Sequence, residues 1–375
     1  MRSPFVYGKI AEGSCFIDRE VETSQLQENF HNLTNTVLIS PRRWGKSSLV
    51  RKARMIVESS YPDVRTCDVD LFNVRTEEEF YTKLASEVLK ATSGRWEEMA
   101  RFARRFLSAF VPSLSFGDPS NSIKVSFSVQ PTRQTADDIL DMAEMVAVEK
   151  GFTLVVCIDE FQQIANFPDS DFLQAKLRSH WQKHQHVAYC LYGSRRHMMT
   201  EIFTDPGKPF YKFGQNIFLE KVDKNLWPGF IIERFSDTGK VISTGQCERI
   251  VSLVDNNPYY VQQLSEMVWN RVKTSCSDEI VEDAFSALVA MQAGLNLALT
   301  QTLTITQQNL LHAIVDDNTQ LTSSVVLEKY GLKNSLTVQR AKKALTRLDI
   351  IDDFGRFVTL EDPVYAWWLR HVYFA

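Results

Sequence analysis

The 375-residue sequence lacks several features that would assign it to a specialised class of protein. No apolar run reaches about 18 residues, the length that a transmembrane helix needs, and the N-terminus has no apolar signal core. The six cysteines are scattered without a CxxC pair, which argues against disulfides and against a cysteine-based zinc site. These absences predict a cytoplasmic protein with no membrane partner.

A strong charge and low-complexity sequence are also missing. The net charge is −4, so no global field attracts nucleic acid, and any DNA contact requires a local basic patch. No internal repeat or long disordered linker is evident. With 44% hydrophobic and 23% charged residues, the chain has the composition of a soluble globular protein of two or three domains.

The most informative stretch is residues 36–50, with the sequence TVLISPRRWGKSSLV. Residues 36–39 predict a short buried strand, and Gly45-Lys46-Ser47-Ser48 begins an apolar-periodic helix. Strand, loop and helix in this order form the setting of a phosphate-binding P-loop, in which backbone amides and the helix dipole favour an anion. We predict that Lys46 contacts the β- and γ-phosphates of a nucleotide and that the Ser47 hydroxyl binds Mg²⁺.

The rest of the loop completes the predicted nucleotide-binding residues. Ser40 stands where the usual pattern G-x-x-x-x-G-K-[ST] has its first glycine. The alternative interpretation of the stretch is an ordinary strand–helix turn that happens to contain Gly-Lys-Ser. The loop residues assigned to the nucleotide, besides Lys46 and Ser47, are Ser40, Pro41, Arg42, Arg43, Trp44, Gly45 and Ser48.

An acidic pair follows a second buried strand. Residues 152–158 are almost continuously apolar and lead into Asp159-Glu160, which is typical of a parallel strand with functional residues at its C-terminal end. We interpret the pair as a Walker B motif. Asp159 would hold Mg²⁺, and Glu160 would orient or deprotonate the attacking water. An acidic turn after a strand is the alternative.

The strand predicted at 187–192 ends in Gly193-Ser194-Arg195-Arg196. Ser194 is the candidate for contact with the γ-phosphate or the lytic water. Arg195 and Arg196 either contact phosphate or a neighbouring subunit, or belong to a solvated basic turn. The predicted catalytic residues are therefore Glu160, Lys46 and Ser194.

The alternation of helices and strands predicts an α/β fold with a parallel sheet of about five strands. A β-hairpin at about 111–131 interrupts this rhythm as an insertion, after a helix at about 95–110. From about 225 the pattern changes to helices alone. The predicted domains are 1–222 with the P-loop, 223–300 as a helical unit, and 301–375.

Residues 301–375 predict three helices and a hairpin, which is the order of a winged helix. The third helix carries basic residues on one side and is the element that normally enters a major groove. The domain as a whole has eight basic and eight acidic side chains, and packing against the rest of its own chain is the alternative. The residues proposed to contact DNA are Arg340, Lys342, Lys343 and Arg347.

Together these motifs resemble the AAA+-related STAND-type ATPases of the archaeal ATPase family, which also has bacterial members. The resemblance runs through the PFVYG and FIDRE segments near the N-terminus, the loop SPRRWGKSSL, the IDEFQ segment, Gly193-Ser194, and Asn257-Pro258-Tyr259-Tyr260. Asn256 departs from the family's glycine before the last of these. The resemblance implies a P-loop NTPase (AAA+-like) sheet with an α-helical lid and a C-terminal winged helix. It also places Phe16, Arg19 and Pro258 near the adenine.

The expected cofactors are ATP and Mg²⁺, and the expected activity is slow Mg²⁺-dependent ATP hydrolysis that drives a conformational switch. One alternative is an ATP-gated DNA-binding protein that uses the winged helix. Another is a non-hydrolysing interaction module with ATP as a structural ligand, although Glu160 argues against it. A protein partner or assembly into a homo-oligomer is expected.

Overall fold

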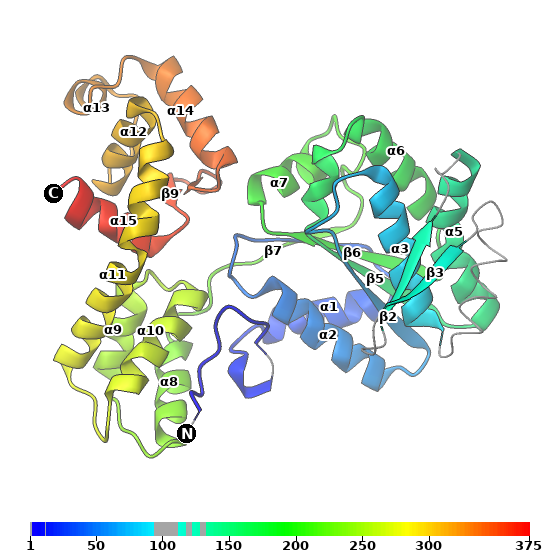
Figure 1. The fold of residues 1–375 in the computed structure, drawn as a ribbon, viewed down its shortest axis with the longest axis horizontal. Helices are drawn as coiled ribbons and strands as arrows, with labels where there is room; N and C mark the ends of the chain where they lie inside the picture. Colours follow the sequence, from blue (N-terminus) through cyan, green and yellow to red (C-terminus); the bar gives the residue numbers. More distant parts are fainter. Residues whose placement is uncertain (1, 12, 94–111, 118–121, 128–132) are drawn as a thin grey trace. The chain divides into compact units, whose positions relative to one another are not determined.

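The computed structural model describes residues 2–11, 13–93, 112–117, 122–127 and 133–375. The helix predicted at about 95–110 lies outside these ranges. The chain divides into two compact units (Figure 1). We call Arg19–Glu220 the sheet unit, and we call Met1–Asp18 with Lys221–Ala375 the helical unit.

The sheet unit is built on five parallel strands in the order β2-β5-β6-β1-β7, which confirms the predicted parallel sheet. Strand β6 lies between β1 and β5, with Ile39 opposite Gly193 and Ile158 opposite Leu191. All three strands therefore end at the same edge of the sheet. The strands are β1 (Thr36–Ile39), β2 (Val64–Asp70), β5 (Thr153–Asp159), β6 (Val187–Gly193) and β7 (Gln215–Phe218).

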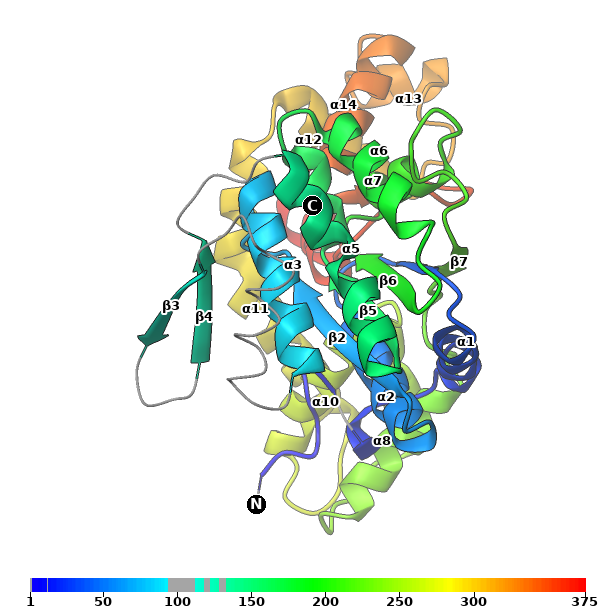
Figure 2. The ribbon, with the colours of Figure 1, turned by 90° about the vertical axis from the view of Figure 1, so that its right-hand side faces the viewer.

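Helices cover both faces of this sheet, which explains why β5 and β6 are apolar along almost their whole length. On one face, Arg54 of α2 donates to Thr66 Oγ1 (2.9 Å) and pairs with Asp68 (3.1 Å), both on β2. Figures 1 and 2 show α3, α5 and α6 on the other face. The helices of the unit are α1 (Glu20–His31), α2 (Lys46–Ser60), α3 (Glu77–Thr92), α5 (Arg133–Lys150), α6 (Ser170–Trp181) and α7 (Arg196–Thr204).

Two shorter features complete the sheet unit. Strands β3 (Pro112–Gly117) and β4 (Ser122–Phe127) pair antiparallel, within the segment where the insertion is predicted. A 3₁₀ segment, Phe161–Asn166, follows β5 directly. It brings Phe161 into edge-to-face contact with Phe210, at a centroid distance of 5.3 Å.

The helical unit has one continuous apolar core that spans the helices after residue 225. Asn257 caps α10 by accepting from the amides of Tyr259 and Tyr260, with Pro258 at the first helical position. The helices are α8 (Leu226–Ser236), α9 (Thr244–Leu253), α10 (Pro258–Arg271), α11 (Asp278–Thr302), α12 (Ile305–Val315), α13 (Ser324–Lys329), α14 (Ser335–Arg347) and α15 (Pro363–Trp368).

Helices α12, α13 and α14 are followed by the short strands β8 (Ile351–Asp352) and β9 (Thr359–Leu360), which pair antiparallel. This is the predicted order of a winged helix. Lys342 of α14 pairs with Asp353 at the start of the wing (3.3 Å). The last helix continues as a π-helical turn, Leu369–Tyr373.

Within the ranges that the structure describes, no helix is both long enough and apolar enough to cross a lipid bilayer.

Candidate functional site

The candidate site lies at the C-terminal edge of the parallel sheet, where the ends of β1, β5 and β6 meet. The loop after β1 turns through two left-handed residues, Arg43 (φ 66°) and Gly45 (φ 91°), and Gly45 is the N-cap of α2. The helical hydrogen-bond ladder starts when Leu49 N donates to the carbonyl of Gly45 (2.9 Å). The amides of the first turn precede this ladder, which is the property that suits a helix N-terminus to anion binding.

Ser40 begins the loop without requiring glycine. It is fully buried, its backbone is not left-handed, and its hydroxyl donates to the carbonyl of Pro41 (3.0 Å). The missing glycine of the usual pattern therefore causes no backbone strain at this position.

Lys46 is 6% exposed, so the first residue of α2 holds its charge inside the fold. Its ammonium group lies 3.4 Å from the carbonyl of Pro41, across the loop. Trp44 and Gly45 are partly buried, whereas Arg42 and Arg43 are exposed. The loop thus surrounds a buried lysine with backbone groups and leaves two arginines at its outer side.

Ser47 Oγ donates to Asp159 Oδ2 at 2.8 Å, which joins the first turn of α2 to the end of β5. Burial raises the pKa of Asp159 to about 6, although the hydrogen bond from Ser47 and the charge of Lys46 both lower it. Mg²⁺ commonly takes one or two protein oxygens and completes its coordination with phosphates and water. A hydroxyl and a partly buried carboxylate in contact are a donor set that fits this ion.

Glu160 follows in a left-handed backbone conformation, with φ 54°. Its Oε2 accepts from Ser194 Oγ (2.9 Å) and from Gln162 Nε2. Arg42 of the loop donates through Nε to the same Ser194 hydroxyl (3.3 Å). The structure therefore brings together the three predicted elements: the P-loop, the acidic pair and the serine at the end of β6.

Sequence reasoning assigned no role to Gln162, although it belongs to the IDEFQ segment that carries the family resemblance. Nothing in the residue pattern indicates its contact with Glu160, because a glutamine two residues after an acid is an ordinary surface sequence. The sequence signal for its burial is its place between Phe161 and Ile164, two apolar residues that indicate a buried turn after the strand.

The three residues predicted to lie near the adenine belong to different units. Arg19 is in the sheet unit, where its guanidinium is buried and donates to the carbonyl of Glu220 (2.5 Å) and to Glu22 (3.0 Å). Phe16 and Pro258 are in the helical unit. Gln262, one turn after Pro258, accepts from Val6 N and donates to the carbonyl of Cys15, both at 3.1 Å.

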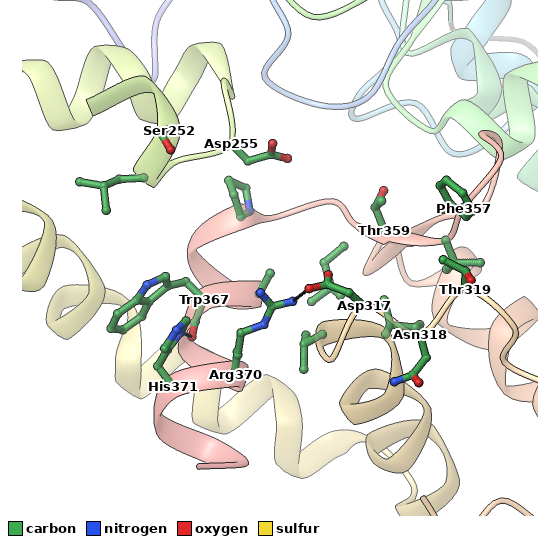
Figure 3. A pocket seen from close by; sticks show the side chains of 17 residues that line it. Ser252, Asp255, Asp317, Asn318, Thr319, Phe357, Thr359, Trp367, Arg370 and His371 are labelled. Carbon is green, nitrogen blue, oxygen red and sulfur yellow. Dashed lines mark hydrogen bonds and ion pairs between the residues drawn. The ribbon is translucent and has the colours of Figure 1, made fainter. Parts of the chain in front are cut away.

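These two hydrogen bonds hold the N-terminal segment of the helical unit against α10. Cys15 is the residue before Phe16, and Gln262 lies one helical turn after Pro258. Tyr7 packs edge-to-face on Tyr259, and a hydrogen bond with Glu266 raises the pKa of Tyr7 to about 12. A separate pocket of about 530 Å³ lies in the same unit (Figure 3). It is lined in part by Trp367 and by the ion pair of Arg370 with Asp317 (2.7 Å), and none of its described lining residues is a predicted site residue.

Comparison with known proteins supports this architecture. Residues 297–371 match the family described as "Probable winged helix domain". The fold is similar to the Walker-type ATPase PABY2304 of Pyrococcus abyssi, with a TM-score of 0.66 and 18% identity over 95% of this chain and 97% of that one. No curated protein matches the sequence.

Two proteins of Aeropyrum pernix are also similar in fold. The ORC2 protein, solved as ADPNP and ADP complexes, has a TM-score of 0.58 and 15% identity over 97% of this chain and 93% of that one. The ORC1 protein, solved in complex with DNA, has a TM-score of 0.51 and 14% identity over 94% and 92%. The predicted likeness to AAA+ P-loop ATPases with a C-terminal winged helix is thereby confirmed for the fold.

The raised pKa of Asp159 predicts how stability depends on pH. Because its pKa of about 6 in the folded protein exceeds the ordinary value of 3.8, the folded state binds the proton more tightly than the unfolded state does. Stability therefore falls as pH rises from about 4 to about 6 and is level above that range. Asp159→Asn should stabilise the metal-free protein above pH 6, by at most about 3 kcal/mol, and by less at pH 5.

Urea unfolding at pH 5 and pH 7.5 without Mg²⁺ measures this difference. Glu201→Gln, at an exposed carboxylate of α7, is the matched control and should show no such pH-dependent gain. A gain for Asp159→Asn that is equal at both pH values would contradict the assignment.

Proposed function

We propose that the chain is a Mg²⁺-dependent ATPase of the STAND type that hydrolyses ATP slowly and uses the nucleotide as a conformational switch. The observation that carries the proposal is the pair of hydrogen bonds Ser47–Asp159 and Ser194–Glu160 at one sheet edge, beside the buried Lys46. A strand–helix turn or an acidic turn with no ligand has no need to bury a lysine beside a partly buried carboxylate in this way.

Each residue has a distinct role in this proposal. Lys46 and the first-turn amides of α2 bind the β- and γ-phosphates, and Ser47 with Asp159 holds Mg²⁺. The ion, when bound, neutralises charge on the phosphates during transfer. Glu160 accepts the proton of the attacking water, and Ser194 and Arg42 contact the γ-phosphate. Phe16, Arg19 and Pro258 remain the proposed adenine-side residues.

Replacing Lys46 and Glu160 separates binding from hydrolysis. Lys46→Ala should weaken ATP binding by about 100-fold or more, because it removes charge-assisted hydrogen bonds to the phosphates. Glu160→Gln should keep the ATP affinity and lower single-turnover hydrolysis by about 10²- to 10⁴-fold. Isothermal titration with ATP and rapid-quench hydrolysis measure the two effects. Unchanged ATP affinity in Lys46→Ala would refute the site, and no hydrolysis by the wild type would favour the non-hydrolysing alternative.

Ser40 offers a test of whether the missing glycine slows the enzyme. Since Ser40 has ordinary backbone dihedrals and a satisfied hydroxyl, Ser40→Gly should leave ATP affinity and hydrolysis unchanged. It should also destabilise the protein by about 0.5–1 kcal/mol, from the added freedom of glycine in the unfolded chain. Rapid-quench hydrolysis and urea unfolding measure the two quantities. A clear rise in the hydrolysis rate would instead show that Ser40 restrains turnover.

A second function, DNA binding through the winged helix, is favoured by the exposed face of α14. Arg340, Lys343 and Arg347 recur at helical spacing and are exposed, whereas Val338, Ala341 and Leu345 form the buried face. Lys342 lies off this basic face and pairs with Asp353. The wing adds Phe354 and Phe357, which are 47% and 49% exposed. The similar ORC1 protein was solved with DNA.

If α14 binds DNA, alanine at Arg340, Lys343 or Arg347 should each weaken duplex binding, because each substitution removes a cation that neutralises a phosphate. The slope of log K against log salt should become shallower by about 0.9 for each phosphate that is no longer neutralised. Fluorescence anisotropy at two salt concentrations, with and without ATP, measures both quantities. Lys273→Ala, an exposed lysine of the same unit outside the winged helix, is the matched control and should have no effect. Equally weakened binding for Lys273→Ala and the α14 variants would indicate nonspecific charge effects.

A further inference from the structure

Gln162 is a polar residue buried inside the sheet unit. Its side chain is 1% exposed, and its Nε2 donates to Glu160 Oε2. Its Oε1 is buried and has no hydrogen-bond partner among the residues that the structure describes. A buried amide oxygen without a partner destabilises a fold. An apolar side chain of similar size would avoid that cost, so the amide is explained best by what its nitrogen does.

Gly193 provides the space in which Gln162 sits. The backbone of Gly193 is not left-handed, so the glycine is not required for conformation. A Cβ at this position would lie 1.9 Å from Gln162 Oε1 and 2.9 Å from Met199 Sδ. Any larger residue at the end of β6 must therefore displace Gln162, and with it the donor to Glu160.

The same strand end also fixes the other donor. Ser194, the next residue, donates to Glu160 Oε2 at 2.9 Å. Gln162, in the turn after β5, and Ser194, at the end of β6, thus donate to the same carboxylate oxygen. The left-handed backbone of Glu160 (φ 54°) sets the direction in which its side chain leaves the main chain. The rotation of the carboxylate is determined by Gln162 and Ser194 together.

We propose that Gln162 is the positioning residue for Glu160. We also propose that position 193 is a glycine because a larger residue would leave no space for the Gln162 side chain. Gln162 does not touch the reacting atoms. It orients the carboxylate whose other oxygen is left to take the proton of the attacking water. The inference rests on the proposed function of Glu160 as the base, and it assigns a role that the P-loop and the acidic pair do not include.

The first test compares two buried glutamines. Gln174 of α6 is also 1% exposed, and its Oε1 has no hydrogen-bond partner within the described part of the chain. Gln162→Leu should lower single-turnover ATP hydrolysis by about 10- to 100-fold, with the ATP dissociation constant changed less than about twofold. Gln174→Leu should leave both quantities at the wild-type level. A wild-type rate for Gln162→Leu, or an equal reduction for Gln174→Leu, would overturn the proposal.

Gly193 supplies an independent variant. Gly193→Ala should reproduce the reduced rate of Gln162→Leu, because the added methyl group displaces the glutamine. In a Gln162→Ala background only the flexible Met199 side chain, with Sδ 2.9 Å from the added Cβ, still has to shift, so Gly193→Ala should cause little further reduction. Additive reductions in the double variant would mean that Gly193 acts by another route and would overturn this part of the proposal.

A crystal structure of Gln162→Leu with ADP distinguishes failure of the inference from failure of the proposed function. A displaced Glu160 carboxylate supports positioning even if the wild type hydrolyses no ATP, in which case the ATPase function alone is refuted. A carboxylate in its original place overturns the positioning role, whatever the hydrolysis rate of the wild type.

Discussion

The hydrogen bond from Ser47 to Asp159 is the interaction on which the geometry of the site depends. The two residues belong to α2 and β5, and β5 is separated from β1 by β6. A serine at the start of α2 can reach Asp159 only if the loop after β1 carries the helix across the end of β6. The end of β6 must then lie beneath the loop, which explains why Ser194 is within reach of both Arg42 and Glu160.

The same hydrogen bond holds a partly buried carboxylate next to the buried Lys46. Lys46 and Asp159 are held close enough for the lysine to lower the carboxylate pKa, yet burial still raises that pKa to about 6. The site without ligand is therefore less stable than a neutral one would be. A polyphosphate and a divalent cation carry the charges that would balance this arrangement, and a preformed site does not need to reorganise when they bind. The contact of Asp159 with Ser47 near Lys46 therefore explains both the raised pKa of Asp159 and the choice of a polyphosphate with a divalent cation as the proposed ligands.

The strands and most helices could be predicted because their signals are local. The apolar run of β5, the short strand β1 and the helix that begins at Lys46 each depend on residues that are neighbours in the sequence. The P-loop and the acidic pair could be predicted for the same reason, since each motif follows its own strand. Their meeting at one edge followed from the parallel sheet alone.

Interactions between distant side chains could not be predicted in this way. Gln262 binds the backbone of Val6 and Cys15 about 250 residues away, and no periodicity in either segment indicates it. Gln162 and Gly193 are 31 positions apart, and their relation is visible only when the space around the glycine is measured. At the end of β6 the space that a Cβ of Gly193 would take is occupied by the Gln162 side chain. That side chain donates to the carboxylate proposed as the base, so a larger residue at position 193 would disturb Glu160, which follows the end of β5.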